Sequence, residues 1–270
     1  MSIAHWSLPI ARILNLCVLL PSLVAATNAV ADPKHPAIAR HDMVVAANPL
    51  AAAAGRDMLR AGGSAIDAAI ATQLVLNLVE PQSSGIGGGA FVLYWSNAAQ
   101  RVESFDGRET APAAARPDRF LEPDGKPIPF MTAVIGGKSV GVPGTLRVLA
   151  LAHAKHGRLP WATLFEPAIH LAEGGFAISP RLHDMLAAES HLAATEPARS
   201  YFYDNDGKPK PVGTRLRNPE LAGVLRGIAE DGPDFFYKGK VAHDIVATVT
   251  QAPGNPGDIS EADQIGRAHV

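Results

Sequence analysis

A run of glycines between a predicted helix and a predicted strand is the feature that most restricts how this chain can fold. The stretch SSGIGGGAFVLYW, residues 83–95, has four glycines within five residues and then becomes apolar. A dinucleotide-binding loop needs a strand before its glycines and a helix after them, because the phosphates must meet a helix N-terminus. The order here is reversed, which argues against a phosphate site. We expect these glycines to allow positive φ or a close backbone approach where the strand begins.

Two helices are predicted before the glycines. The first spans residues 49–61, with an apolar face formed by Leu50, Ala54, Met58 and Ala61. The second begins at Ser64, with Asp67 as its partner in a capping box, and ends before Pro81. Four residues at spacing four predict its buried stripe: Ile66, Ile70, Leu74 and Leu78.

After the glycines the pattern changes to a hairpin and then to more helices. Strands are predicted at residues 90–95 and 101–105, and long loops with short strands at 107–142. Further helices are expected at about 144–156, 161–173, 180–189, 219–230 and 239–251. Ser179-Pro180 and Asn218-Pro219 supply N-cap and N1 residues for two of them. The alternation indicates a mixed α/β (α+β) protein.

The N-terminus has the pattern of an export signal. Arg12 precedes an apolar run at 13–24, and Ala29-Val30-Ala31 resembles a signal-peptidase site, so residues 1–31 are expected to be removed. The run is too short to span a bilayer comfortably, so we favour cleavage over a retained anchor. The single cysteine, Cys17, would leave with this segment. A mature protein without cysteine suits a bacterial periplasm or secretion.

Composition excludes several classes of partner. The formal net charge of −2 and the absence of a basic block argue against nucleic acid and anionic membrane surfaces. No metal-binding motif or cofactor fingerprint is found, so no metal and no cofactor are expected. The mature region is expected to span 32–263. Residues 264–270 end in IGRAHV, which is one reading frame of a common sequencing adapter, and we expect them to be an artefact.

Arg108 is the candidate binding residue of the chain. It follows the second predicted strand, between Asp106 and Glu109 in the motif FDGRETAP. An arginine guanidinium can hold a carboxylate through two parallel hydrogen bonds, which suits a substrate carboxylate. A surface arginine paired with its own acidic neighbours is the commoner situation, and the residues alone favour that alternative.

Several motifs in order resemble one family, the γ-glutamyltranspeptidases (glutathione hydrolases). They are HDMVVAANPLAAAAGRDMLRAGGSAIDAAIA, VEPQSSGIGGGAF, FDGRETAP, SVGVPGTL, FEPAIHLAEGGF and FFYKGKVA, between about residues 40 and 263. The resemblance implies the N-terminal nucleophile hydrolase fold, a four-layer αββα sandwich, which is incomplete in this chain. It also implies a precursor that cleaves itself into a large and a small subunit, with this chain in the large one.

The resemblance implies a specific chemistry. A threonine at the new N-terminus of the small subunit attacks the γ-glutamyl amide, and water or an amino acid then accepts the γ-glutamyl group. Arg108 corresponds to the arginine that holds the α-carboxylate of the donor, glutathione or another γ-glutamyl compound. The nucleophile would lie beyond residue 270, so no residue of this chain is assigned as catalytic and the chain alone is expected to be inactive.

Two other functions remain open from the sequence. A glutaryl (cephalosporin) acylase of the same fold would also bind a substrate ending in a carboxylate. A periplasmic amino-acid- or peptide-binding protein would be a non-enzyme alternative, although it gives no account of the ordered motifs.

Overall fold

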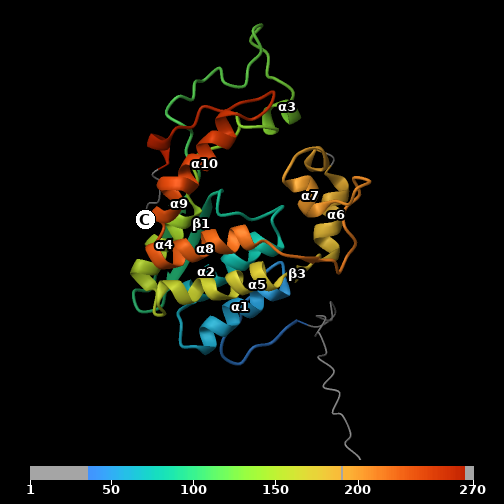
Figure 1. Ribbon diagram of the computed structural model, residues 1–270. Helices are drawn as coiled ribbons and strands as arrows, with labels where there is room; N and C mark the ends of the chain where they lie inside the picture. Colours follow the sequence, from blue (N-terminus) through green and yellow to red (C-terminus); the bar gives the residue numbers. More distant parts are fainter. Residues whose placement is uncertain (1–35, 190, 265–270) are drawn as a thin grey trace, which may run out of the picture. The chain divides into compact units, whose positions relative to one another are not determined.

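The computed structural model describes residues 36–189 and 191–264 (Figure 1). The chain divides after Arg40 into two units, and every described helix and strand belongs to the second. The expected signal peptide, residues 1–31, and residues 265–270 of the expected tail lie outside the described residues. Within the described part, no helix is long and apolar enough to cross a membrane.

The second unit is mainly helical. Its longer helices are α1 (Pro49–Arg60), α2 (Ala65–Val79), α4 (Thr145–His156), α5 (Glu166–Gly174), α6 (Pro180–Ala188), α8 (Pro219–Asp231) and α10 (Gly239–Thr250). Its shorter helical segments are α3 (Phe130–Val134), α7 (Ala198–Phe202), α9 (Asp234–Tyr237), and the 3₁₀ turns η1 (Trp161–Phe165), η2 (Leu192–Ala194) and η3 (Glu261–Asp263). Its strands form two antiparallel pairs, β1 (Ala90–Ser96) with β2 (Arg101–Gly107), and β3 (Phe176–Ala177) with β4 (Arg215–Leu216).

The predicted helix caps are present. Ser64 Oγ accepts the backbone N–H of Asp67 at 3.1 Å, and the Asp67 carboxylate accepts the backbone N–H of Ser64 at 2.7 Å. Asn218 Oδ1 accepts the N–H of Leu221 at 2.9 Å at the start of α8. Each side chain satisfies a donor that the first helical turn leaves without a partner, which is why these short polar residues set the helix starts.

Helix α2 lies at the centre of the core and packs against α1, α4, α5 and η1. All four residues of its predicted stripe are buried. The predicted face of α1 is correct for Ala54 and Met58 but wrong for Leu50 and Ala61, which are exposed. Ala51 takes the buried place in the first turn, because i, i+4 spacing drifts around a helix of 3.6 residues per turn.

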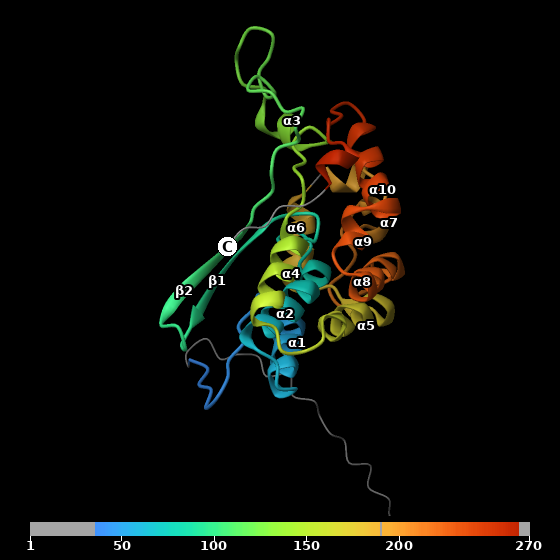
Figure 2. The same cartoon turned by 90° about the vertical axis from the view of Figure 1, so that its left-hand side faces the viewer.

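The β1–β2 hairpin packs against α4 with one face, while its other face is exposed (Figure 2). Val92 and Tyr94 point towards the core, with Phe105 on the partner strand. The outward positions of β1 are also apolar: Phe91, Leu93 and Trp95. Strict alternation therefore leaves an exposed hydrophobic side on β1, whereas β2 exposes Ser104 and Asp106 beside Val102.

The segment predicted as loops, residues 107–142, contains short ordered pieces. Isolated bridges join Thr110 to Val142 and Leu121 to Pro127 in place of the expected short strands. Helix α3 was not predicted, because it is one short turn with no buried residue and hence no apolar face to detect. The helix expected at 161–173 begins as the 3₁₀ turn η1 and continues as α5.

Glu103 on β2 supplies a prediction about acid stability. Its carboxylate accepts hydrogen bonds from Lys155 Nζ at 2.8 Å and from His156 Nε2 at 3.0 Å, and Arg101 lies 3.2 Å away. The contact with Lys155, followed by that with His156, lowers the pKa of Glu103 from 4.5 to about 2. Because the folded-state pKa lies below the unfolded one, this stabilisation is complete above about pH 4.5 and is lost as the pH falls towards 2.

We therefore expect Glu103→Gln to lower the free energy of unfolding at pH 6. The difference between the two proteins should decrease as the pH falls from 4.5 to 2. Urea titrations of both proteins across that range measure it. Glu122→Gln, which changes an exposed loop glutamate, serves as the control and should show no such trend. A Glu103→Gln effect that is constant down to pH 2 would contradict the role of this ion-pair cluster.

Candidate functional site

Three motifs that are separate in the sequence meet at the end of the hairpin. The carbonyl oxygen of Gly88 accepts the backbone N–H groups of Gly144 at 2.9 Å and Thr145 at 3.1 Å. This ties the glycine run to the first turn of α4. Thr110, just after β2, pairs with Val142 by two backbone hydrogen bonds of 3.4 and 2.9 Å. The segments SSGIGGG, FDGRETAP and SVGVPGTL are thus held together by their backbones.

Close backbone packing explains part of the glycine run, and positive φ does not. None of its four glycines is among the described glycines with positive φ, so that half of the expectation is wrong. A Cβ atom added to Gly89 would lie 2.8 Å from the backbone nitrogen of Glu109, whereas one added to Gly87 would meet open space. Gly141 also lies close to this residue, because its added Cβ would lie 3.0 Å from Glu109 Cβ. Glycines of two motifs therefore pack closely against Glu109.

Arg108 directly follows β2, the second strand of the hairpin. Its backbone N–H donates to Asp106 Oδ1 at 2.9 Å, and its side chain is 70% exposed. Arg108 Nε lies 3.4 Å from Glu109 Oε2, an ion-pair contact to a buried oxygen that has no hydrogen-bond partner. No described residue bonds the two terminal guanidinium nitrogens. The arginine is thus paired with its acidic neighbour, as the commoner alternative expected, yet the edge that can grip a carboxylate stays available.

A cavity of about 300 Å³ lies beside Arg108. Its walls come from Arg108–Pro112, from Lys138–Gly141 and from the Arg119–Phe120 pair. Arg108, Arg119 and Lys138 line it together with Glu109, and the charge of Arg119 is balanced by Asp258, which is not one of the lining residues. A cavity of this size and charge suits a small anionic ligand.

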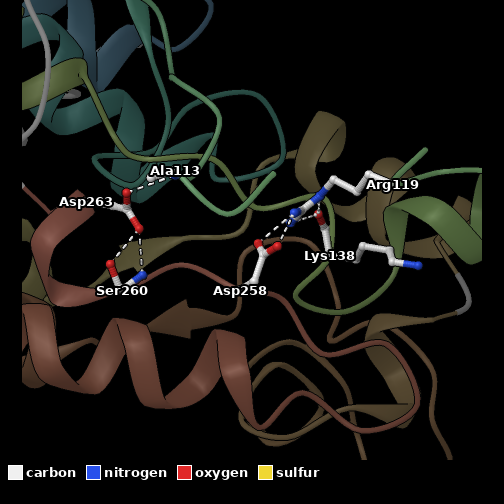
Figure 3. Close-up of polar contacts among 6 residues, drawn as sticks. All are labelled: Ala113, Arg119, Lys138, Asp258, Ser260 and Asp263. Atoms are coloured by element: carbon white, nitrogen blue, oxygen red, sulfur yellow. Dashed lines mark hydrogen bonds and ion pairs between the residues drawn. The ribbon is translucent and has the colours of Figure 1, made fainter. Parts of the chain in front are cut away.

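The wall that carries Arg119 is secured by an ion pair that sequence reasoning missed. Arg119 Nη1 contacts both oxygens of Asp258, at 2.6 and 2.7 Å (Figure 3). Its Nε and Nη2 donate to the Lys138 carbonyl at 2.8 and 2.6 Å. The Arg119 side chain is only 11% exposed, so both partners are needed to satisfy a buried cation. No local sequence pattern predicts an ion pair between residues that are 139 positions apart.

Asp263 holds the C-terminal segment to the same loop. Its Oδ1 accepts the N–H of Ala113 at 3.0 Å, and its Oδ2 accepts from the backbone and hydroxyl of Ser260 (Figure 3). These hydrogen bonds, that of Ser260 first, lower the pKa of Asp263. Within the residues that the structure describes, no group of three histidine, cysteine or acidic side chains could hold a metal ion.

Comparison with known proteins gives a consistent result at the sequence level. A family model described as gamma-glutamyltranspeptidase matches residues 51–265. The glutathione hydrolase proenzyme of Bacillus subtilis (strain 168) is 41% identical over 218 residues, which are 81% of this chain and 37% of the relative. The glutathione hydrolase proenzyme of Escherichia coli (strain K12) is 35% identical over 86% of this chain and 39% of the relative. The chain thus spans less than half the length of these relatives.

Solved structures agree with the sequence comparison. The γ-glutamyltranspeptidase of Helicobacter pylori has a TM-score of 0.81 and 30% identity, covering 87% of this chain and 66% of that one. A cephalosporin acylase from Bacillus halodurans has a TM-score of 0.69 and 32% identity, covering 88% of this chain and 46% of that one. These neighbours confirm the expected fold class, of which the described residues form a part. The chain belongs to the γ-glutamyltranspeptidase family.

Proposed function

We propose that this chain is the donor-binding part of an enzyme that transfers a γ-glutamyl group from glutathione or γ-glutamyl amides to water or amino acids. The observation that carries the proposal is the meeting of the three family motifs around Arg108, Glu109 and a cavity with excess positive charge. Family membership supports the reaction class. The relatives are longer, and the activity proposed here is that of the whole enzyme.

Arg108 is proposed to bind the α-carboxylate of the donor. Its terminal nitrogens are exposed and have no partner among the described residues, while the contact of Nε with Glu109 restrains the plane of the guanidinium. A planar, always-charged fork aligns a carboxylate in a way that a lysine ammonium cannot. The nucleophilic threonine is proposed to lie on the small subunit, and no residue of this chain is given a catalytic role.

The small subunit is the proposed partner. Two parts of the chain that no described residue covers or pairs with support its docking. The outward side of β1 is apolar, with Leu93 at its centre 74% exposed. Residues 43–47 alternate outward and inward like a strand, with Val44 and Ala46 on the core, but their N–H groups make no backbone hydrogen bond to a described residue. An extended segment and a hairpin with one apolar outer strand are both suited to packing in a larger sheet. Residues 1–31 are proposed to export the precursor to the periplasm or the medium.

A glutaryl acylase is the second candidate, and the likeness to the cephalosporin acylase favours it. A glutaryl group ends in a carboxylate that Arg108 could also hold, but it lacks the α-amino group of glutamate. Comparing kcat/KM for glutathione and for a glutaryl amide on the full-length enzyme distinguishes the two. The binding-protein alternative loses its basis, because the chain belongs to an enzyme family.

Arg108→Lys in the full-length enzyme tests the proposed function. Lysine keeps the charge but loses one of the two parallel hydrogen bonds, which should raise KM for glutathione by about 10- to 100-fold, since one bond to a charged group contributes roughly 1.5–3 kcal/mol. Initial rates against glutathione concentration measure it. The control is Arg116→Lys, an exposed arginine paired with Asp118, which should leave KM unchanged. An unchanged KM for Arg108→Lys would remove the proposed role.

A further inference from the structure

Lys138 lies where two neighbouring cavities meet. It lines the cavity of about 300 Å³ beside Arg108, and it also lines a second cavity of about 340 Å³ whose walls include Asp118 and Asp258. Arg119 is the other residue that the two cavities share. A molecule held by Arg108 in the first cavity therefore has room to continue past Lys138 towards the second.

The charges that line the two cavities balance except at Lys138. The other charged side chains form three ion pairs: Arg108 with Glu109 at 3.4 Å, Arg116 with Asp118 at 3.3 Å, and Arg119 with Asp258 at 2.6 Å. The Lys138 ammonium makes no ion pair or hydrogen bond to a described residue. The two cavities therefore carry one net positive charge, and it belongs to a lysine that no described carboxylate contacts.

The backbone of Lys138 is held in place although its ammonium is not. Its carbonyl accepts two hydrogen bonds from the Arg119 guanidinium, at 2.8 and 2.6 Å. Its N–H donates to the Asn255 carbonyl at 3.2 Å, and the N–H of Gly137 donates to the same oxygen at 2.7 Å. In Figure 3 the Lys138 side chain extends away from the Asp258 carboxylate. The lysine stem thus starts from a fixed position, which is what a binding side chain requires.

Glutathione has one charge of the opposite sign left over when its γ-glutamyl group is bound. The γ-glutamyl group carries an α-carboxylate and an α-ammonium, so its own charges cancel. The remaining charged group at neutral pH is the carboxylate of the terminal glycine, at the other end of the tripeptide. An extended tripeptide spans roughly 10 Å, so a substrate anchored at Arg108 places its second carboxylate well away from the first. A second cation in the adjoining space matches that carboxylate.

From this arrangement we propose that Lys138 binds the glycine carboxylate of glutathione, on the part of the substrate that leaves as cysteinylglycine. The inference rests on the proposed function, in which Arg108 holds the α-carboxylate at the other end. Lys138 is then a specificity residue. It makes a γ-glutamyl peptide with a free C-terminal carboxylate a better donor than a γ-glutamyl compound without one. It takes no part in breaking the amide bond.

The test compares hydrolysis of glutathione and of its glycine ethyl ester by the full-length enzyme, since only glutathione has the second carboxylate. The kcat/KM of the unchanged enzyme should be about 3- to 10-fold higher for glutathione, the size expected for one ion pair at a partly exposed site. Lys138→Met keeps the apolar stem and should remove this preference by slowing glutathione alone. Lys138→Arg should retain it. Lys126→Met changes an exposed lysine that pairs with Asp124 outside both cavities, and as the matched control it should also retain the preference.

Reversal of the charge and the Arg108 variant separate this inference from the proposed function. Lys138→Glu should make the ester the better donor, whereas Arg108→Lys should raise KM for both substrates alike, because both contain the α-carboxylate. No preference in the unchanged enzyme, or an equal loss of activity towards both substrates in Lys138→Met, would overturn the role of Lys138 and leave the proposed function intact. An unchanged KM for both substrates in Arg108→Lys would instead overturn the proposed function, and this inference with it.

Discussion

The purified 270-residue chain is expected to release no p-nitroaniline from γ-glutamyl-p-nitroanilide, at any pH and with or without an acceptor dipeptide. The proposed chemistry needs a threonine whose own α-amine acts as its base, and such a residue exists only at a chain end made by cleavage. The threonines that flank the site, Thr110 and Thr145, both lie inside the chain: Thr110 pairs through its backbone with Val142, and the Thr145 backbone N–H is bonded to Gly88. Neither is suited to replace it.

A colorimetric assay at high protein concentration measures this result. The full-length glutathione hydrolase of Bacillus subtilis is a suitable positive control, because it is 41% identical to this chain over the shared region. Turnover that persists through purification, scales with the amount of chain and disappears in Arg108→Ala would contradict the assignment of the nucleophile to another subunit. Turnover insensitive to Arg108→Ala would point to a contaminant.

Gly144→Ala is expected to destabilise the fold strongly. A Cβ atom at Gly144 would lie 2.7 Å from the carbonyl carbon of Gly107 and still closer to its oxygen, with Arg108 O at 3.2 Å. These are backbone atoms of the hairpin end, so they cannot turn aside as a flexible side chain can. Overpacking against backbone should lower the free energy of unfolding by roughly 2–4 kcal/mol. Urea unfolding followed by circular dichroism measures it.

Gly223→Ala is the matched control for this prediction. Gly223 lies exposed inside α8, and a Cβ atom there would meet nothing within 4 Å. Alanine has the higher helix propensity, so this variant should gain up to about 1 kcal/mol. The same chemical change thus has opposite signs at two sites. Equal effects, or a stable Gly144→Ala protein, would show that the hairpin and α4 are not packed as closely as described.

Local patterns were enough to predict most helices and the hairpin. The stripe of α2, the capping box at Ser64 and the cap at Asn218 involve residues within a few positions of one another, and all were confirmed. The two-residue strands β3 and β4 were not predicted, because each is shorter than one period of alternation and is stabilised by its distant partner. The predicted buried face of α1 was right for two of its four residues, since packing against α2 decided which side is buried.

The candidate site required more than local patterns. Family resemblance supplied the proposed role of Arg108, which the residues alone did not favour. The packing of Gly89 and Gly141 against Glu109 and the Arg119–Asp258 pair arise from contacts between distant segments.

The sequence by itself determined where helices start and end, the order of helix, glycines and strand, and hence the exclusion of a phosphate loop. Those properties depend on hydrogen bonds and side-chain periodicity within one turn or one strand. Only the tertiary structure decided which of the four glycines packing requires and which face of the hairpin stays uncovered. Burial and orphaned hydrogen-bonding groups are properties of segments brought together across the chain, so no single stretch of sequence contains them.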